Sequence, residues 1–157
     1  MRQFYDLIDE LSEFFNEPLI AEVNDTCKLL VNEKIEVQIE MDFMGEFIII
    51  AAIISELPPG KFRENILKDA LKSNHLIDSH RSFLAYIGVN NQLIVSENLF
   101  AHAITAEQLY NNIIALTKRA KKWQDAINRG ETSPQDQDEM PIAQTKGKQQ
   151  LFGFTVN

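Results

Sequence analysis

The chain has 157 residues, of which 45% are hydrophobic and 24% are charged, and its formal net charge is -8. This length suits one domain with a buried core, and the composition excludes a disordered chain. The apolar run at 47–54 is far shorter than the roughly 20 residues of a membrane-spanning helix. The N-terminus has acids where a signal peptide is apolar, and Cys27 has no second cysteine to pair with. We therefore expect a cytoplasmic protein.

The first third of the chain carries the acidity and begins with a predicted amphipathic helix. Residues 1–46 hold 12 acidic and three basic residues, a net charge of -9, whereas residues 47–157 hold 11 and 12, a net charge of +1. Such acidity argues against a nucleic-acid partner and favours a neutral or basic one, although the acids also simply keep a protein soluble. Within 3–15 the apolar residues recur at helical spacing, opposite a face of acids. These apolar residues are Phe4, Leu7, Ile8, Leu11, Phe14 and Phe15.

Three strand-like segments follow. The short apolar stretch 27–31 precedes IEVQIEMD at 35–42, which alternates strictly between apolar and polar residues and therefore predicts a half-buried antiparallel strand. The run FIIIAAII at 47–54 is too short for a typical helix, so we expect an interior strand. Its two faces are either both covered, or one is covered and the other is an exposed adhesive surface. The sequence LPPG at 57–60 ends the strand, because proline donates no hydrogen bond to a ladder.

A second helix and a strand pair come next. Apolar spacing over 62–72 predicts the helix. The stretches 82–89 and 92–97 predict two strands joined at Asn90-Asn91, a pair that tolerates the left-handed backbone of a hairpin turn.

The third helix is the most clearly marked element. Thr105-Ala-Glu-Gln108 has the form of a capping box, and Gly130 suits the far end. Heptad spacing between them predicts packing on the protein's own sheet, with a partner helix as the alternative. The apolar residues at this spacing are Leu109, Ile113, Leu116, Ala120, Trp123 and Ile127. The later turns carry a basic cluster, which we expect to be a solvated face rather than a phosphate site. The cluster consists of Lys118, Arg119, Lys121 and Lys122.

The composition changes at residue 131. ETSPQDQDEMPIAQTKGKQQ has few apolar residues and two prolines, so we predict one domain at 1–130 and a flexible polar tail at 131–157. The tail ends in the apolar, strand-like LFGFTV. This motivates the hypothesis that the end lies in the protein's own binding groove, or a neighbour's, as a placeholder.

Catalytic and metal-binding patterns are missing from the sequence. His75, Asp78 and His80 lack the i, i+4 spacing of a helical metal site, and there is no Gly-rich phosphate loop or nucleophile elbow. Cys27, near a strand start, is expected to be a small buried residue rather than a nucleophile. We therefore predict a non-enzymatic protein without metal or cofactor.

The order of elements has recognisable landmarks. They are the amphipathic FYDLIDELSEFF, the strand pair IEVQIEMD and FIIIAAII, the ELPPG turn, the helix FRENILKDALKSN, the hairpin SFLAYIGVNNQLIVSENL and the closing helix AEQLYNNIIALTKRAKKWQDAI, in which Ala120 and Trp123 form an A-x-x-W. In this order, in size and in acidity, residues 1 to about 129 resemble the class I type III secretion chaperones of the Tir chaperone (CesT-like) family. The resemblance implies an α+β fold of order α-β-β-β-α-β-β-α, with a twisted antiparallel sheet packed against helices. It also implies a cytoplasmic homodimer that keeps the N-terminal chaperone-binding segment of a secreted effector extended and secretion-competent, without nucleotide.

The resemblance also implies surfaces and partners. The helix at 62–72 and the strand at 82–89 would form the dimer interface, and the first helix and early strands would form grooves for effector side chains. An extended peptide can add as a strand to an open edge, for which 27–31 and its neighbouring strand are the candidates, while 47–54 is the expected central strand. A secretion ATPase is a further candidate partner; nucleic acid and membrane insertion are not expected. Candidate dimer residues are Phe62, Ile66, Leu67, Leu71, Phe83, Ala85 and Ile87. Candidate effector-binding residues are Leu29, Val31, Ile35, Glu36, Val37, Ile39 and Glu40.

Two other classes of function remain open from the sequence. One is a small-molecule-binding or regulatory α+β dimer, in which His75, His80 and Cys27 would line a pocket. The other is a structural subunit that offers its 109–127 face to a partner helix.

Overall fold

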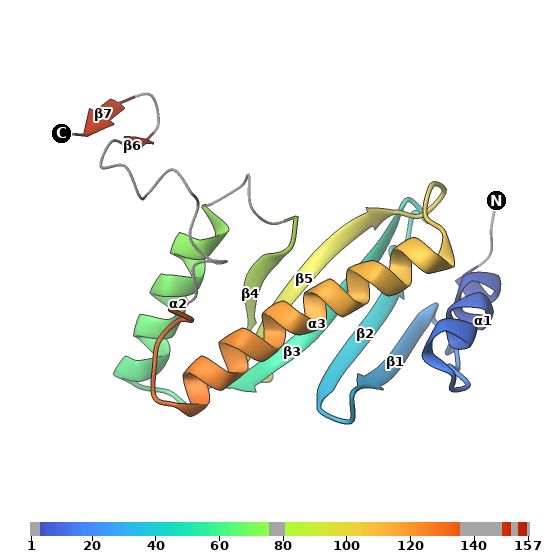
Figure 1. Cartoon of the computed structure of the whole chain (residues 1–157), viewed down its shortest axis with the longest axis horizontal. Helices are drawn as coiled ribbons and strands as arrows, with labels where there is room; N and C mark the ends of the chain where they lie inside the picture. The colour runs from blue at the N-terminus through green and yellow to red at the C-terminus, as the bar shows by residue number, and fades with distance from the viewer. Residues whose placement is uncertain (1–3, 76–80, 136–148, 152–153, 157) are drawn as a thin grey trace.

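The computed structural model describes residues 4–75, 81–135, 149–151 and 154–156. Five antiparallel strands form one sheet, and three helices accompany it (Figure 1). The predicted order α-β-β-β-α-β-β-α is confirmed, followed by a short strand pair near the C-terminus. The elements are α1 (Phe4–Phe15), β1 (Thr26–Val31), β2 (Ile35–Met41), β3 (Phe47–Glu56), α2 (Lys61–Asn74), β4 (Phe83–Ile87), β5 (Gln92–Phe100), α3 (Ala106–Asn128), β6 (Gln149–Leu151) and β7 (Phe154–Val156).

The strands lie in the order β1-β2-β3-β5-β4, so β3 is central, as its apolar run predicted. The edges of the sheet are β1 and β4. The turn between β1 and β2 places Asn32 and Glu33 at φ of 52° and 57°, and the β4–β5 turn places Asn91 at φ of 54°. Asparagine tolerates this left-handed region, which is why two short turns can connect these strands.

One face of the sheet holds the core. Along β3, Ile48, Ile50, Ala52 and Ile54 are buried, whereas the alternating residues from Phe47 to Ser55 are only half-buried. The sequence left two possibilities for this strand, and the structure shows the second: one face is covered and the other is open.

Helix α3 lies along the buried face of the sheet (Figure 1). Its capping box is formed, with the Gln108 N–H donating to Thr105 Oγ1 at 3.1 Å and the Thr105 N–H donating to Gln108 Oε1 at 3.0 Å. Gly130, at φ of 81°, follows the last turn, in agreement with the prediction. All six residues at heptad spacing are buried, so this side of α3 packs on its own sheet and is not available to a partner helix.

Helix α2 lies beside edge strand β4 (Figure 1). The Asn74 side chain accepts a hydrogen bond from the Leu84 N–H and donates one to the Leu84 carbonyl, both at 2.7 Å. The start of the predicted tail also reaches α2, because the Thr132 hydroxyl donates to Asp69 and Pro134 is buried.

The apolar end of the tail forms strands β6 and β7, which pair antiparallel with each other. The hypothesis that this end is a placeholder in a groove stays a prediction. No helix in the described part of the chain has both the length and the apolar character that crossing a bilayer requires.

Candidate functional site

The face of the sheet opposite the core, here called the open face, carries apolar side chains that are mostly half-buried or exposed. Cross-strand neighbours share a face, so the register places Ile53 beside Ile94, Ile94 beside Ala85, and Phe47 beside Phe100. The rings of Phe47 and Phe100 lie 5.1 Å apart. The apolar open-face residues of the three strands are Phe47, Ile49, Ala51 and Ile53 of β3, Ile94 and Phe100 of β5, and Phe83, Ala85 and Ile87 of β4.

The helices make their contacts with the other face. Helix α3 packs on the face that holds the buried β3 residues, and α1 packs against α3. On α2, Arg63 donates at 2.9 Å to Tyr86, which alternates with the open-face residues of β4. Within the described residues, therefore, no helix covers the open face. An apolar surface of this kind marks a site for a protein partner.

The open face becomes acidic towards β1. Glu36, Gln38 and Glu40 occupy the alternate positions of β2, and the register puts Gln38 beside Ala51 and Glu40 beside Ile49. Next to them on β1, the register puts the exposed Lys28 beside Gln38. The surface thus offers apolar contacts on three strands, with two carboxylates and one lysine next to them. It is complementary to a segment that carries apolar side chains with neutral or basic neighbours.

The structure divides the predicted effector-binding residues into two groups. Glu36 and Glu40 lie on the open face, as just described. The five apolar ones lie in the core and are at most 6% exposed, because the inward positions of β1 and β2 face the helices. Those side chains face away from the open face and cannot contact a client bound there, so that part of the prediction is revised. The buried residues are Leu29, Val31, Ile35, Val37 and Ile39.

Strand β1 is an edge strand, as predicted. It pairs only with β2 in the described sheet, so its other side presents backbone groups that no strand occupies. The start of that edge is used internally, because the Thr26 carbonyl accepts a hydrogen bond from the Glu22 N–H at 2.7 Å. The remainder can accept an added strand.

The predicted dimer residues are mostly at the surface of α2 and β4. Phe62, Leu71, Phe83 and Ile87 are 40%, 70%, 40% and 38% exposed. Leu67 and Ala85 are half-buried, and Ile66 alone belongs to the core. The exposed side chains of β4 also belong to the open face, so β4 takes part in both surfaces.

The structure separates the two described residues of the predicted small-molecule pocket, Cys27 and His75. Cys27 is fully buried in β1, where burial raises the pKa of its thiol and leaves it a poor nucleophile. His75 is exposed at the end of α2, next to the opposite edge of the sheet. Asp78 and His80 lie outside the described residues, and the described ones contain no group of His, Cys, Asp and Glu that could hold a metal.

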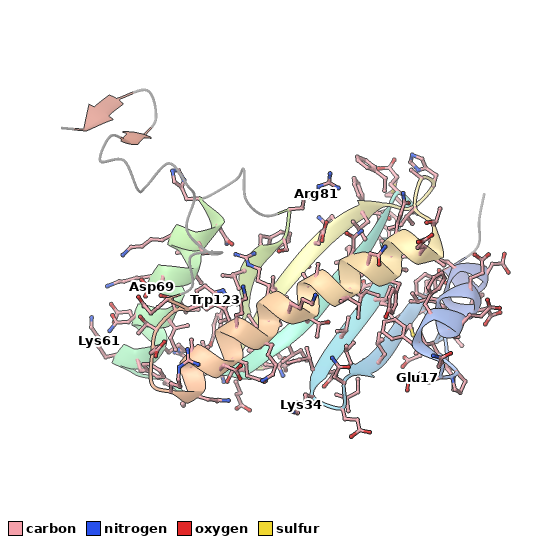
Figure 2. The ribbon with its side chains drawn as sticks, viewed as in Figure 1. Glu17, Lys34, Lys61, Asp69, Arg81 and Trp123 are labelled. Atoms are coloured by element: carbon pink, nitrogen blue, oxygen red, sulfur yellow. The ribbon has the colours of Figure 1, made fainter. Side chains whose placement is uncertain are left out.

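Two charged side chains, Arg119 and Glu97, are buried although the sequence did not predict it. Arg119, predicted to belong to a solvated cluster, is only 6% exposed; it donates to the Ser82 carbonyl at 2.8 Å and to Ser73 Oγ at 2.8 Å, and so ties α3 to α2 and to the start of β4. Glu97 is 7% exposed on the inner side of β5 and lines a cleft of about 880 Å³ together with Arg81 (Figure 2) and the first turns of α3. Burial raises the pKa of Glu97, and the nearby Arg81 partly opposes that rise.

The fold matches solved structures. No protein-family model and no curated protein matches the sequence. A chain of the ExsC–ExsE complex is 17% identical with a TM-score of 0.66, over 76% of this chain and 90% of that chain. A chain of the HopA1–SchA chaperone–effector complex is 17% identical with a TM-score of 0.62, over 78% and 94%. A chain of the Yersinia pestis type III secretion chaperone SycH in complex with a fragment of YscM2 is 11% identical with a TM-score of 0.58, over 76% and 98%. The expected α+β fold is thereby confirmed.

Proposed function

We propose that this chain is a type III secretion chaperone that binds the N-terminal segment of a secreted effector and keeps it extended for export. The open face carries the proposal: an apolar surface beside carboxylates and a free strand edge, on a fold shared with chains of chaperone–effector complexes. Such a surface can hold a peptide and needs no chemistry. We therefore propose a binding protein without catalytic activity, acting in the cytoplasm.

The client would be held in two ways. Its backbone would add to the edge of β1, where main-chain hydrogen bonds supply affinity for any extended sequence. Its apolar side chains would cover the open face, and basic residues beside them would meet Glu36 and Glu40. A client remains unfolded while these contacts stabilise it more than its own fold does.

Two copies of the chain would associate through α2 and β4. The exposed Phe62, Leu71, Phe83 and Ile87 give this region an apolar surface that can meet its own symmetry copy. The dimer would join two open faces into one long binding surface. By family resemblance, a secretion ATPase is the proposed recipient of the loaded complex.

The first test is native mass spectrometry of the protein purified from its own cells. We expect twice the 18.0 kDa chain mass plus one larger polypeptide. Hydrogen exchange of the bound polypeptide should show that the contacted segment lies near its N-terminus and that the rest of that region lacks the protection of a compact fold. A bare monomer, or a species carrying only a few hundred extra daltons, would contradict the proposal and favour the ligand-binding alternative.

A pair of variants ties the result to the open face. Ile53→Asp places a charge at the centre of that face, whereas Val23→Asp places the same charge at a residue that is 97% exposed in the α1–β1 loop. We expect the first to lose the polypeptide and the second to keep it, with both retaining the circular dichroism of the parent. Equal retention by both would show that the client binds elsewhere.

A further inference from the structure

A second, chemically different surface lies on the helix side of the sheet. A pocket of about 450 Å³ opens between the β1–β2 turn and the second half of α3. Its rim carries four lysines, Lys34 from the turn and Lys118, Lys121 and Lys122 from α3. Figure 2 shows Lys34 at the end of the β1–β2 hairpin. We call this the lysine pocket.

The floor of the lysine pocket is apolar. Val31 and Ile35 flank the turn, and Ile114 lies one helical turn before Lys118 on the same side of α3. Thr117, also in the lining, is buried, and its hydroxyl already donates to the Ile113 carbonyl at 2.7 Å. The pocket therefore offers a guest apolar contact below and positive charge around it.

The gathering of lysines needs an explanation beyond the helix dipole. The dipole acts within the last turn of a helix, and that turn of α3 carries no basic residue, so the dipole does not account for Lys118, Lys121 and Lys122. Nor does it account for Lys34, which the fold brings from a segment with a net charge of -9. On α3, Lys118 lies three and four residues before Lys121 and Lys122, and like charges at this helical spacing destabilise a helix. Among the described residues, Asp125 neutralises Lys121 at 2.8 Å, while no ion pair involves Lys34 or Lys118.

We propose that the lysine pocket binds an acidic segment of a partner protein that carries an apolar anchor side chain between carboxylates. The anchor would rest on Val31, Ile35 and Ile114, and the carboxylates would pair with the lysines. Charge complementarity distinguishes this partner from the client of the open face, which should be neutral or basic. Because the two surfaces are on opposite sides of the sheet, both partners can be bound at once.

The test uses the full-length protein and a defined probe. A fluorescein-labelled, capped peptide DEDLFEDE is titrated by fluorescence anisotropy at low salt, next to a peptide in which Leu-Phe is replaced by Ser-Ser. We expect the apolar peptide to bind about tenfold or more tightly than the serine peptide, because burying even one large apolar side chain is worth that factor. Binding should also weaken as salt is added. Equal binding of the two peptides would overturn the proposal, since it would show only general attraction of acids.

Matched variants then locate the site. Lys34→Glu with Lys118→Glu reverses two rim charges and should weaken binding by about tenfold or more. Lys28→Glu with Lys68→Glu makes the same change in net charge at exposed lysines outside the pocket and should change binding by less than about twofold. Equal loss in both pairs would overturn the assignment to the lysine pocket. The assay needs no effector client, so it can fail or succeed independently of the proposed chaperone function.

The chain contains one competing occupant of suitable chemistry. Its own sequence DQDEMPI, at 136–142, combines three acids with apolar residues. A full-length variant with Asp136→Asn, Asp138→Asn and Glu139→Gln tests it. Unchanged peptide affinity supports the partner proposal, whereas binding seen only after this neutralisation assigns the pocket to the chain's own segment and overturns it.

Discussion

Disrupting the proposed dimer surface is the sharpest single test of how this protein assembles. Phe83 on β4 and Leu71 on α2 are 40% and 70% exposed in one chain, and both would be covered in the dimer. Replacing both by serine should leave the fold intact, because neither belongs to the core. The exposed parts together amount to about one whole apolar side chain.

The expected loss follows from that exposed surface. Fully burying one such side chain is worth roughly 2 kcal/mol. Each protomer of a symmetric dimer contributes the same residues, so the double substitution should weaken association by about 4 kcal/mol, which raises the dissociation constant about a thousandfold.

Sedimentation velocity over a dilution series measures this constant directly. The control is Val23→Ser with Phe43→Ser, which removes two side chains that are 97% and 96% exposed and lie outside α2 and β4. We expect the control to dissociate like the parent and the Phe83 and Leu71 variant to sediment as a folded monomer. A parent that is already monomeric, or a variant that dimerises as tightly as the parent, would refute the interface.

Three further substitutions test the energetics of the fold. Thr105→Ala removes the capping box of α3 and should lower the free energy of unfolding by about 1 kcal/mol in urea melts. Arg119→Met leaves the Ser82 carbonyl and Ser73 without their charged donor and should lower it by about 2 kcal/mol, within the range for hydrogen bonds that involve a charged group; a loss below about 1 kcal/mol would place the guanidinium in solvent. Glu97→Gln should raise the melting temperature near neutral pH, because burial raises the pKa of Glu97 and its charged form destabilises the folded state above that pKa. The advantage of Glu97→Gln should vanish as the pH falls towards the ordinary glutamate pKa of about 4.3; an advantage independent of pH would contradict this origin.

The order of elements could be predicted because their local patterns are strong. The strict alternation of β2 and the capping box at Thr105 each favour one structure with little competition. The central place of β3 could be predicted because its sequence is apolar at consecutive positions, which favours an interior strand. The run is also too short for a typical helix. These features depend on residues close together in the chain.

The functional surfaces depend on residues far apart in the chain, and there the sequence was less informative. Alternation on β2 identified two faces but could not say which one the helices cover, so Val37 and Ile39 were assigned to a client although they form the core. Arg119 looked like its lysine neighbours, since only tertiary packing brings Ser73 and Ser82 to it. Lys34 joins the α3 lysines only through the β1–β2 turn.

The arrangement of the sheet explains why this protein should not act alone. A sheet with one apolar open face and two edge strands invites pairing with any extended chain, and proteins usually cover or charge such edges. Here the β4 edge lies beside α2, which carries the exposed Phe62 and Leu71 of the proposed dimer surface, and the β1 edge lies next to the carboxylates of β2. The apolar residues beside β4 would favour self-association at that edge. The carboxylates beside β1 would favour neutral or basic segments there. On the proposed function, the same exposure that would make the isolated chain prone to aggregation would become selective binding once a dimer partner and a client covered it.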